Sequence, residues 1–585
     1  MTGLKTAGPS VPTTRGRAAV WRGLALPIAT GLMLSVIFPP FSWWWLTPVA
    51  LLPLVIASLE ARYNKWTFLY IWLITTLYYL ANLTWLSGIT VAGYIALSIY
   101  CGLYLAGFSC LLRWVCRTGA MPIWLAAPIL FTSIEFLRDH FLGGFPWFTL
   151  GVAFTSSLTV VQSAALFGAA GLSFLAAFTS GALAQGLLRY TNPSAARPHA
   201  TTRIGYVLLA VAWCSVLWYG HVQLQHRHFQ PGPRVAVLQQ NIPQSIKDNN
   251  SISSQTQLFN SYYQLSVLAT KLKPNLIAWP ETMVPGFLNP SWLDQSTQWY
   301  AIGHGRRTLA MDKQFAMRLA AFSALHHTAL LVGSAGVRFN RSGRIAQMQN
   351  IAVMFTPRRG ELPHYYAKRH LVPFGEYVPF KKSAPWLHRL LLYFTPFGPN
   401  NDYSLTPGTS WHRFRLRVGA REYRFGVPIC YEDAMSHPDR SFARPRHHKK
   451  GVDFLVTISN DGWYQSRAEL LQHLQLDQIR AVENRVSIAR SVNGGYCGFI
   501  NPLGEIIKLA GSPGHHAFVS GVACAELPID MRISLFSRIG DILPRATQML
   551  SLLYLGILAL AGWRKRRRRA AADRKSDTGA MPAAE

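Results

Sequence analysis

Acidic side chains are scarce in this sequence of 585 residues, where 26 Asp and Glu stand against 57 Lys and Arg and the formal net charge is +31. Charged residues of both signs make up only 14% of the chain, whereas half of its residues are hydrophobic. In a soluble protein this charge would suggest nucleic-acid binding. Here the basic residues flank apolar segments, most densely at 564–569, as they do beside membrane spans. The composition predicts a membrane protein, and we expect no nucleic-acid partner.

Paired cysteines are also lacking. The seven cysteines are an odd number and none has C-x-x-C spacing, so neither a disulfide framework nor a zinc site is expected. Several lie in or beside apolar stretches, where cysteine behaves as a small hydrophobic residue. Cys497 and Cys524 are the pair left for a structural disulfide, which nothing in the sequence requires. Only Cys430 has surroundings that suggest catalysis.

Several apolar stretches are long enough, at ~20 residues, to cross a membrane. The first lacks a small-x-small cleavage site, so we expect an uncleaved anchor and not a signal peptide. The stretches lie near 20–38, 43–60, 66–87, 90–112, 122–138, 158–188, 204–222 and 546–563. The expected organisation is an N-terminal segment, a bundle of about seven helices, a separate domain, a final span and a basic tail, at 1–19, 20–223, 224–545, 546–563 and 564–585.

The charges of the connecting loops predict an orientation. The connections after the second, fourth and sixth spans contain Arg or Lys, whereas those after the first and third contain neither. Positive loops tend to stay in the cytoplasm, so the N-terminus and the even-numbered connections are expected there. The domain at 224–545 then faces the opposite side, and the last span returns the basic tail to the cytoplasm.

One connection on the predicted outer side carries unusual residues: Glu135, Arg138 and Trp147. One interpretation is an interfacial loop with an aromatic belt. The other is that Glu135 and Arg138, one helical turn apart, form an ion pair that shapes an entry site for lipid together with Trp147, since ionisable residues at membrane depth are often functional. The sequence leaves both open.

The domain at 224–545 contains continuous apolar runs of the kind found in strands buried on both faces. A helix-period stripe over 470–482 precedes the last run, and such alternation predicts a layered α/β architecture. The runs are 234–238, 275–279, 329–333, 351–355, 425–429, 452–458 and 486–492.

The basic segment 435–450 interrupts two of these expected strands, and we expect it to be a solvated loop near anionic headgroups. A metal site at His437, His447 and His448 is disfavoured, because no acidic or cysteine partner stands at a recognisable spacing.

Three short runs each join an expected strand to a turn rich in Pro or Gly, where a reactive side chain can be held rigidly and still be reached. A thiol needs a base to become a thiolate, and acyl chemistry then needs a cation to hold the oxyanion. Glu281, Lys368 and Cys430 supply these three parts. The runs are NLIAWPET at 275–282, YAKRHLVPFGEY at 366–377 and GVPICYED at 426–433. The sequence predicts an enzyme of acyl transfer or amide hydrolysis beside a membrane.

In this order and with these flanks, the three residues resemble the triad of the nitrilase (carbon-nitrogen hydrolase) superfamily. Longer matches resemble its membrane-bound branch, the apolipoprotein N-acyltransferases. These are LVPFGEY at 371–377, CYE at 430–432, SNDGW at 459–463, EFLR at 135–138 and GFPW at 144–147. The resemblance covers most of the chain. It implies a polytopic α-helical membrane bundle joined to a nitrilase-like α-β-β-α sandwich, in the bacterial cytoplasmic (inner) membrane with the sandwich on the periplasmic face.

The resemblance also implies roles for single residues. Glu281 is the general base for Cys430, and Lys368 stabilises the oxyanion with the backbone N–H of Tyr431. Glu376 and Glu432 correspond to further acidic residues of the family, which would orient Lys368 and the incoming amine.

The implied reaction moves a fatty acyl chain from a phospholipid, through a thioester on Cys430, to the α-amine of a lipoprotein's N-terminal diacylglyceryl-cysteine. The partners would be the phospholipid and the lipoprotein, with no cofactor and no metal, and the enzyme is expected to be a monomer. Two alternatives remain: a membrane-tethered amidase or nitrilase that hydrolyses small amides or nitriles, and a polytopic transporter or docking protein whose nitrilase-like domain only binds.

Two positions depart from the family pattern. Asp248 stands where a Trp is common, and Gln240 stands where Gly is common. These changes bear on substrate preference more than on the class of reaction.

Overall fold

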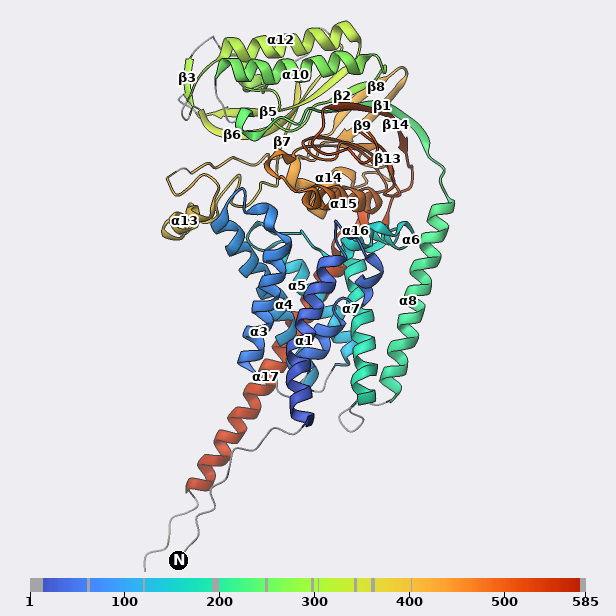
Figure 1. The fold of residues 1–585 in the computed structure, drawn as a ribbon, viewed down its shortest axis with the longest axis vertical. Helices are drawn as coiled ribbons and strands as arrows, with labels where there is room; N and C mark the ends of the chain where they lie inside the picture. Colours follow the sequence, from blue (N-terminus) through green and yellow to red (C-terminus); the bar gives the residue numbers. More distant parts are fainter. Residues whose placement is uncertain are drawn as a thin grey trace, which may run out of the picture.

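Apolar helices form one half of the molecule, and an α/β domain rests on one end of them (Figure 1). The computed structural model describes residues 14–59, 64–118, 121–191, 199–247, 251–295, 299–302, 305–340, 345–358, 363–400 and 402–578. The fold class expected from the sequence is confirmed.

The helices of the bundle run along the long axis of the molecule (Figure 1). They are α1 (Thr14–Val36), η1 (Trp44–Val49), α2 (Leu52–Leu59), α3 (Lys65–Asn82), η2 (Thr84–Leu86), α4 (Val91–Arg117), α5 (Ile123–Arg138), η3 (Phe141–Gly143), η4 (Leu150–Ser156), α6 (Leu158–Val161), α7 (Ala164–Thr191), α8 (His199–Gln225) and α17 (Ile542–Thr578). By length and composition, α4, α7, α8 and the first 27 residues of α17 could each cross a membrane.

Two expected spans differ in form from a single straight helix. The stretch near 43–60 consists of two short helices, η1 and α2. The stretch near 158–188 divides into α6 and α7, and α7 is kinked at Phe167 and Gly168. Gly168 has φ +68°, and a Cβ atom there would lie 2.6 Å from the Phe536 ring of the α/β domain. The kink therefore allows the domain to approach the bundle closely, which hydropathy alone could not reveal.

Two six-stranded mixed sheets form the α/β domain. The first has the order β14-β1-β2-β5-β6-β7 and the second the order β13-β12-β11-β10-β9-β8. The first comprises β1 (Gln230–Gln239), β2 (Leu276–Ala278), β5 (Ala329–Phe339), β6 (Ile345–Phe355), β7 (His364–Ala367) and β14 (Gly521–Ile529). The second comprises β8 (Phe414–Val418), β9 (Arg421–Gly426), β10 (Phe454–Asn460), β11 (Ser487–Asn493), β12 (Gly498–Ile500) and β13 (Ile506–Leu509). Each of the apolar runs predicted as strands lies at one of these strands.

The sheets pack face to face, and helices cover their outer faces. Helices α10 (Ile252–Thr270) and α12 (Leu309–His326) cover the first sheet, and α14 (Ser436–Ala443) and α15 (Arg467–Asn484) lie between the second sheet and the bundle (Figure 1). The core between the sheets contains Val235, Val237, Phe454 and Val456, all fully buried. Smaller elements are α9 (Gln244–Lys247), α11 (Pro290–Leu293), the hairpin β3 (Trp299–Ile302) and β4 (Gly305–Thr308), α13 (Pro385–Leu391), η6 (Leu392–Phe394) and α16 (Leu535–Ile539).

The prediction of a solvated loop at 435–450 was wrong for its first half. Residues 436–443 form α14, whose Asp439 and Phe442 are fully buried. Phe442 packs on the rings of Tyr366 and Trp411. This apolar side chain within a basic segment holds α14 against the α/β domain. Only the part from Arg444 to Lys449 is largely exposed.

Buried polar groups fasten α15 to the bundle. Glu483 accepts a hydrogen bond from the N–H of Ala169 at 2.8 Å, just after the kink of α7. Arg485, which is 2% exposed, donates to the side-chain oxygen of Gln162 at 2.5 Å. Unpaired buried polar groups are costly, so these contacts fix how the α/β domain sits on the helices.

Candidate active site

A single large cavity, of about 670 Å³, contains the three residues that the sequence singled out: Glu281, Lys368 and Cys430. The bundle supplies an apolar wall that includes Trp85, Leu97 and other residues of α4 and its neighbours. The α/β domain supplies the polar end. The cavity therefore joins reactive groups to a surface suited to hydrocarbon.

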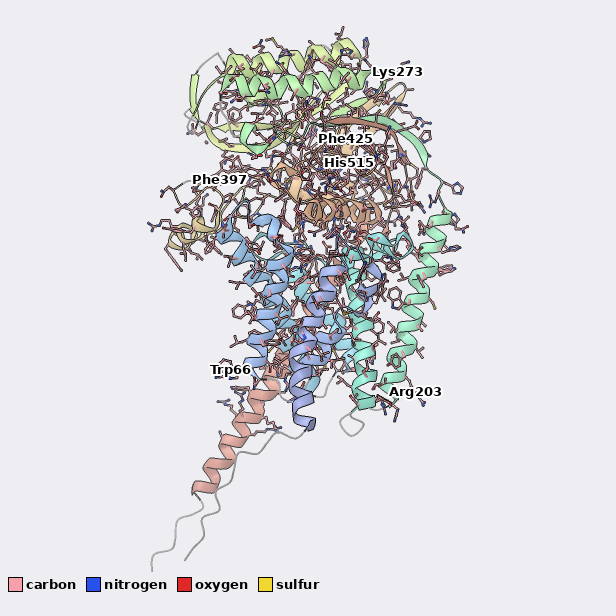
Figure 2. The ribbon with its side chains drawn as sticks, viewed as in Figure 1. Trp66, Arg203, Lys273, Phe397, Phe425 and His515 are labelled. Carbon is pink, nitrogen blue, oxygen red and sulfur yellow. The ribbon has the colours of Figure 1, made fainter. Side chains whose placement is uncertain are left out.

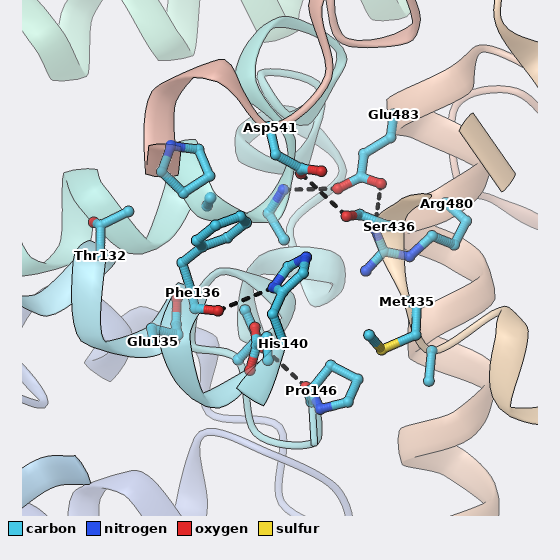
Figure 3. Close-up of a pocket in the computed structure, with 16 residues that line it drawn as sticks. Thr132, Glu135, Phe136, His140, Pro146, Met435, Ser436, Arg480, Glu483 and Asp541 are labelled. Atoms are coloured by element: carbon cyan, nitrogen blue, oxygen red, sulfur yellow. Dashed lines mark hydrogen bonds and ion pairs between the residues drawn. The ribbon is translucent and has the colours of Figure 1, made fainter. Parts of the chain in front are cut away.

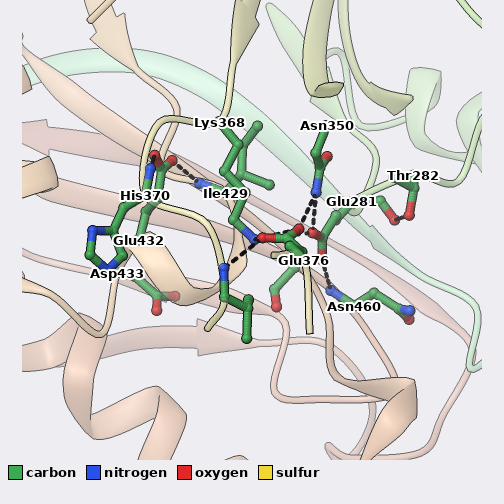
Figure 4. A network of polar contacts seen from close by, with 12 residues as sticks. Glu281, Thr282, Asn350, Lys368, His370, Glu376, Ile429, Glu432, Asp433 and Asn460 are labelled. Atoms are coloured by element: carbon green, nitrogen blue, oxygen red, sulfur yellow. Dashed lines mark hydrogen bonds and ion pairs between the residues drawn. The ribbon is translucent and has the colours of Figure 1, made fainter. Parts of the chain in front are cut away.

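Glu281 follows β2, whose neighbour Trp279 is fully buried. Its two carboxylate oxygens have separate donors: the amide of Asn350 at 2.6 Å and the backbone N–H of Asn460 at 3.0 Å (Figure 4). Glu281 as a whole is buried, with 7% of its surface exposed. A base held in this way from two sides has one fixed orientation toward the cavity.

Lys368 follows β7 and is fully buried. Its Nζ lies 2.9 Å from a Glu376 oxygen and 3.7 Å from a Glu281 oxygen. Burial alone lowers the pKa of a lysine, but Glu376, Cys430 and Glu281 outweigh it, and the net effect raises the pKa of Lys368 above its ordinary value. The ammonium is charged at neutral pH. Glu376 thus contacts Lys368, and the orienting role expected for it stays a prediction.

Cys430 comes directly after the β9 strand and its Pro turn, at the start of the short helix η7 (Cys430–Glu432). Its φ of +51° is in the left-handed region, which non-glycine residues adopt rarely and often at functional sites. Burial and the Glu281 carboxylate raise the pKa of the thiol well above its usual value, and Lys368 opposes them. The resting group is a thiol, so it needs a base when it reacts.

Glu432 does not contact Lys368, contrary to the role expected for it. The carboxylate is fully buried and accepts from the backbone N–H groups of Ile429 at 2.9 Å, Arg369 at 2.8 Å and His370 at 3.0 Å (Figure 4). The hydroxyl of Tyr366 donates to it as well, at 2.8 Å. Glu432 therefore ties the turn of Cys430 to the chain that follows Lys368.

The loop between α5 and η4 extends from the bundle to Tyr431, the residue after Cys430. Tyr431 donates from its hydroxyl to the carbonyl of Gly144 at 2.7 Å. Its ring stacks on Trp147, with ring centroids 5.8 Å apart. Trp147 lines the large cavity, so this part of the proposed lipid entry borders the active site.

The ion pair between Glu135 and Arg138, one of the two interpretations left open by the sequence, is not formed. Arg138 pairs instead with Asp139 at 2.9 Å and donates to the hydroxyl of Tyr79 at 3.0 Å. Glu135 accepts from the backbone N–H of Leu150 at 2.7 Å. It lines a separate cavity of about 40 Å³ between α5 and α15 (Figure 3). Asp139, which follows α5, pairs with Arg138, and Leu150 of the segment that folds back onto α5 binds Glu135. Both side chains therefore have nearer partners than each other.

Sequence reasoning missed Asn350, whose amide also donates to Glu376, at 3.2 Å, and so holds both carboxylates that flank Lys368. A polar residue directly before the apolar run 351–355 was the available signal. Asn460 was within a quoted motif but had no assigned role. Gln240 accepts a short hydrogen bond from Ser520, and Asp248 lies outside the described residues.

No cluster of three or more His, Cys, Asp or Glu side chains with the geometry of a metal site occurs in the described parts of the chain. Cys497 and Cys524 are free thiols in the structure.

Two family models match the chain. Residues 30–182 match the apolipoprotein N-acyltransferase N-terminal domain, and residues 234–531 match carbon-nitrogen hydrolase. An apolipoprotein N-acyltransferase from Azotobacter vinelandii is 30% identical over 510 residues, which cover 83% of this chain and 87% of the relative. One from Geobacter metallireducens is 28% identical over 444 residues, 75% of each chain.

Among solved structures, an amidase from Nesterenkonia sp. is similar at 16% identity and a TM-score of 0.33, over 54% of this chain and 97% of that one. A likeness this low carries no argument about activity. The two family models and the relative that is 30% identical over 83% of this chain show that this chain belongs to the apolipoprotein N-acyltransferase family.

Proposed function

We propose that this chain transfers a fatty acyl group from a phospholipid to the α-amine of a lipoprotein's N-terminal diacylglyceryl-cysteine, through a thioester on Cys430. It acts as a monomer in the bacterial cytoplasmic membrane. The observation that carries the proposal is the single cavity that contains Cys430, Glu281 and Lys368 at one end and the apolar wall of α4 at the other.

In the first half-reaction, Glu281 removes the thiol proton as the sulfur of Cys430 attacks the ester carbonyl of the phospholipid. The oxyanion that forms is stabilised by the ammonium of Lys368 and the backbone N–H of Tyr431. When the intermediate collapses, the C–O ester bond breaks and protonated Glu281 gives its proton to the departing lysophospholipid. The acyl group stays on the sulfur.

In the second half-reaction, the free amine of the lipoprotein attacks the thioester carbonyl. Glu281 takes a proton from the amine, the same two groups stabilise the second oxyanion, and the Cys430 thiolate leaves and is protonated again. The product contains an amide bond, and the enzyme returns to its resting state.

Both substrates carry long acyl chains, and transferring each buried CH₂ from lipid to water would cost ~0.8 kcal/mol. The apolar lining by Trp85, Leu86, Ile89 and Leu97 allows these chains to stay out of water. Hydrolysis of small soluble amides would leave this wall without a role, which favours acyl transfer.

We also propose that the α/β domain faces the periplasm. Helix α17 leads from this domain to the opposite end of the bundle, and its exposed basic run 564–568 lies beyond its apolar part (Figure 1). Trp66 and Arg203 lie at the same far end (Figure 2), and aromatic and basic residues are typical of a membrane–water interface on the cytoplasmic side. The loop charges support the same orientation.

The nucleophile is tested by Cys430→Ala, which removes the sulfur, and Cys430→Ser, which keeps the size but offers a far less acidic group. Both variants are expected to insert normally and to lose transfer to a diacylglyceryl peptide almost entirely. An activity of Cys430→Ala within a few-fold of the parent would exclude this mechanism.

The oxyanion role is tested by Lys368→Met, which keeps the aliphatic stem and removes the cation. Losing one such donor costs ~10²–10³ in rate, and we expect this loss already in thioester formation, measured as single-turnover acylation. Lys368→Arg should also lose activity, since a planar guanidinium does not fit the place of a compact ammonium. If Lys368→Met acylates at the parental rate and fails only in transfer to the amine, Lys368 binds the acceptor instead.

The orientation is tested with Ser253→Cys in α10 and Ala571→Cys in α17, both exposed positions. A maleimide that cannot cross membranes should label the first only from the periplasmic side and the second only from the cytoplasmic side. The parent protein provides the background from its own cysteines. Labelling of both from one side would contradict the proposed topology.

A further inference from the structure

Two buried carboxylates next to the active site, those of Asp433 and Asp461, are connected by two side chains, His473 and Arg490. Asp433 and Asp461 are both fully buried. His473 contacts one oxygen of each, with Nε2 2.8 Å from Asp433 and Nδ1 3.1 Å from Asp461. Arg490 contacts the other oxygen of each, at 3.1 Å in both cases. The four side chains form a closed ring.

Each carboxylate belongs to a turn that carries a reacting group. Asp433 ends the helix η7, and its N–H donates to the carbonyl of Cys430 at 3.0 Å. Asp461 begins the helix η8 (Asp461–Trp463), directly after Asn460, whose N–H holds the Glu281 carboxylate at 3.0 Å. The ring therefore connects the turn of the nucleophile with the turn that orients the base.

The hydrogen bonds of His473 define its charge. An ionised carboxylate can only accept, so each ring nitrogen that faces one must carry a hydrogen, and the ring is an imidazolium. Burial lowers the pKa of His473, but the two carboxylates outweigh it and raise the pKa well above the usual value. The imidazolium and Arg490 in turn hold the pKa of Asp461 at about 2, although burial alone would raise it.

We propose that His473 is a positioning residue for both half-reactions: as an imidazolium between Asp433 and Asp461, it sets the distance between Cys430 and Glu281. Arg490 is shared with a third carboxylate, Asp477, whereas the hydrogen bonds of the His473 ring are to Asp433 and Asp461. His473 touches no reacting group. The His473 ring also packs against Trp147, with ring centroids 5.7 Å apart. Trp147 in turn stacks on Tyr431. The proposal rests on the roles given above to Cys430 and Glu281.

The test is His473→Gln, which removes the positive charge. A Gln side chain cannot donate to both Asp433 and Asp461 as the two ring nitrogens of His473 do. Because a misplacement of about 1 Å can cost ~10² in rate, single-turnover thioester formation should fall on the order of 10²-fold at saturating phospholipid, with KM for phospholipid unchanged. The rate is normalised to folded protein, so that a purely structural role would leave it at the parental value. The matched control is His516→Gln, a half-buried histidine whose ring hydrogen-bonds to the carbonyl of Ala510, and this variant should keep full activity.

A second variant distinguishes the loss of the His473 charge from a general loss of folding. In Asp433→Asn/His473→Gln, the carboxylate that has lost its imidazolium partner is replaced by an amide that can pair with Gln. Coupled groups in one network deviate clearly from additivity, so the double variant should recover about tenfold of the rate lost in His473→Gln. If the two effects simply add, the ring does not couple the two turns.

Alkylation of Cys430 by iodoacetamide, followed by peptide mass spectrometry, needs no lipid substrate and is independent of acyl transfer. We expect it to slow in His473→Gln, because Glu281 no longer meets the thiol correctly. Parental rates of both alkylation and thioester formation in folded His473→Gln would overturn the positioning role. Parental protein that alkylates at Cys430 but never forms an acyl adduct would instead overturn the proposed function.

Discussion

The burial of the Lys368 ammonium between two carboxylates is the interaction on which the active site depends. A fully buried cation is stable only when it is paired and hydrogen-bonded, and Glu376 and Glu281 provide that pairing. Asn350 bridges the same two carboxylates with its amide. Removing Lys368 would leave two neighbouring carboxylates in the interior without a cation, so Lys368, Glu281, Glu376 and Asn350 form one unit.

The same arrangement explains why Cys430 is a thiol at rest. Glu281 and burial raise its pKa, while Lys368 opposes them. In the proposed mechanism, Glu281 is the base for this thiol and the charged Lys368 stabilises the oxyanion. Each residue sits at the end of a strand or in the turn that follows, where a rigid sheet holds a side chain that the cavity can still reach.

The bundle is part of this site and not only an anchor. Its loop at 144–147 contacts Tyr431 through a hydrogen bond and a ring stack. Glu483 and Arg485, at the end of α15, bind Ala169 and Gln162 of the bundle. His473 lies on the same helix. The turn of Cys430 and helix α15 are thus each held to the bundle by buried contacts.

Much of this could be predicted from the sequence, because buried strands appear as apolar runs and reactive residues follow them in turns. The positions of β1, β2, β5, β6, β9, β10 and β11 were predicted in this way, as was the meeting of Glu281, Lys368 and Cys430. Local pattern could not reveal contacts decided by distant parts of the chain. The hydrogen bond from Arg138 to Tyr79, the backbone contacts of Glu432, the helix α14 and the kink at Gly168 all depend on such tertiary contacts.

In the proposed mechanism, the acyl group rests on Cys430 between the two half-reactions. Intact-mass analysis of the purified protein after incubation with phospholipid alone tests this step. We expect a mass increase of one fatty acyl group, localised to the peptide that contains Cys430, and its removal by neutral hydroxylamine or by a diacylglyceryl peptide. An active preparation that transfers acyl groups without any adduct on Cys430 would contradict it.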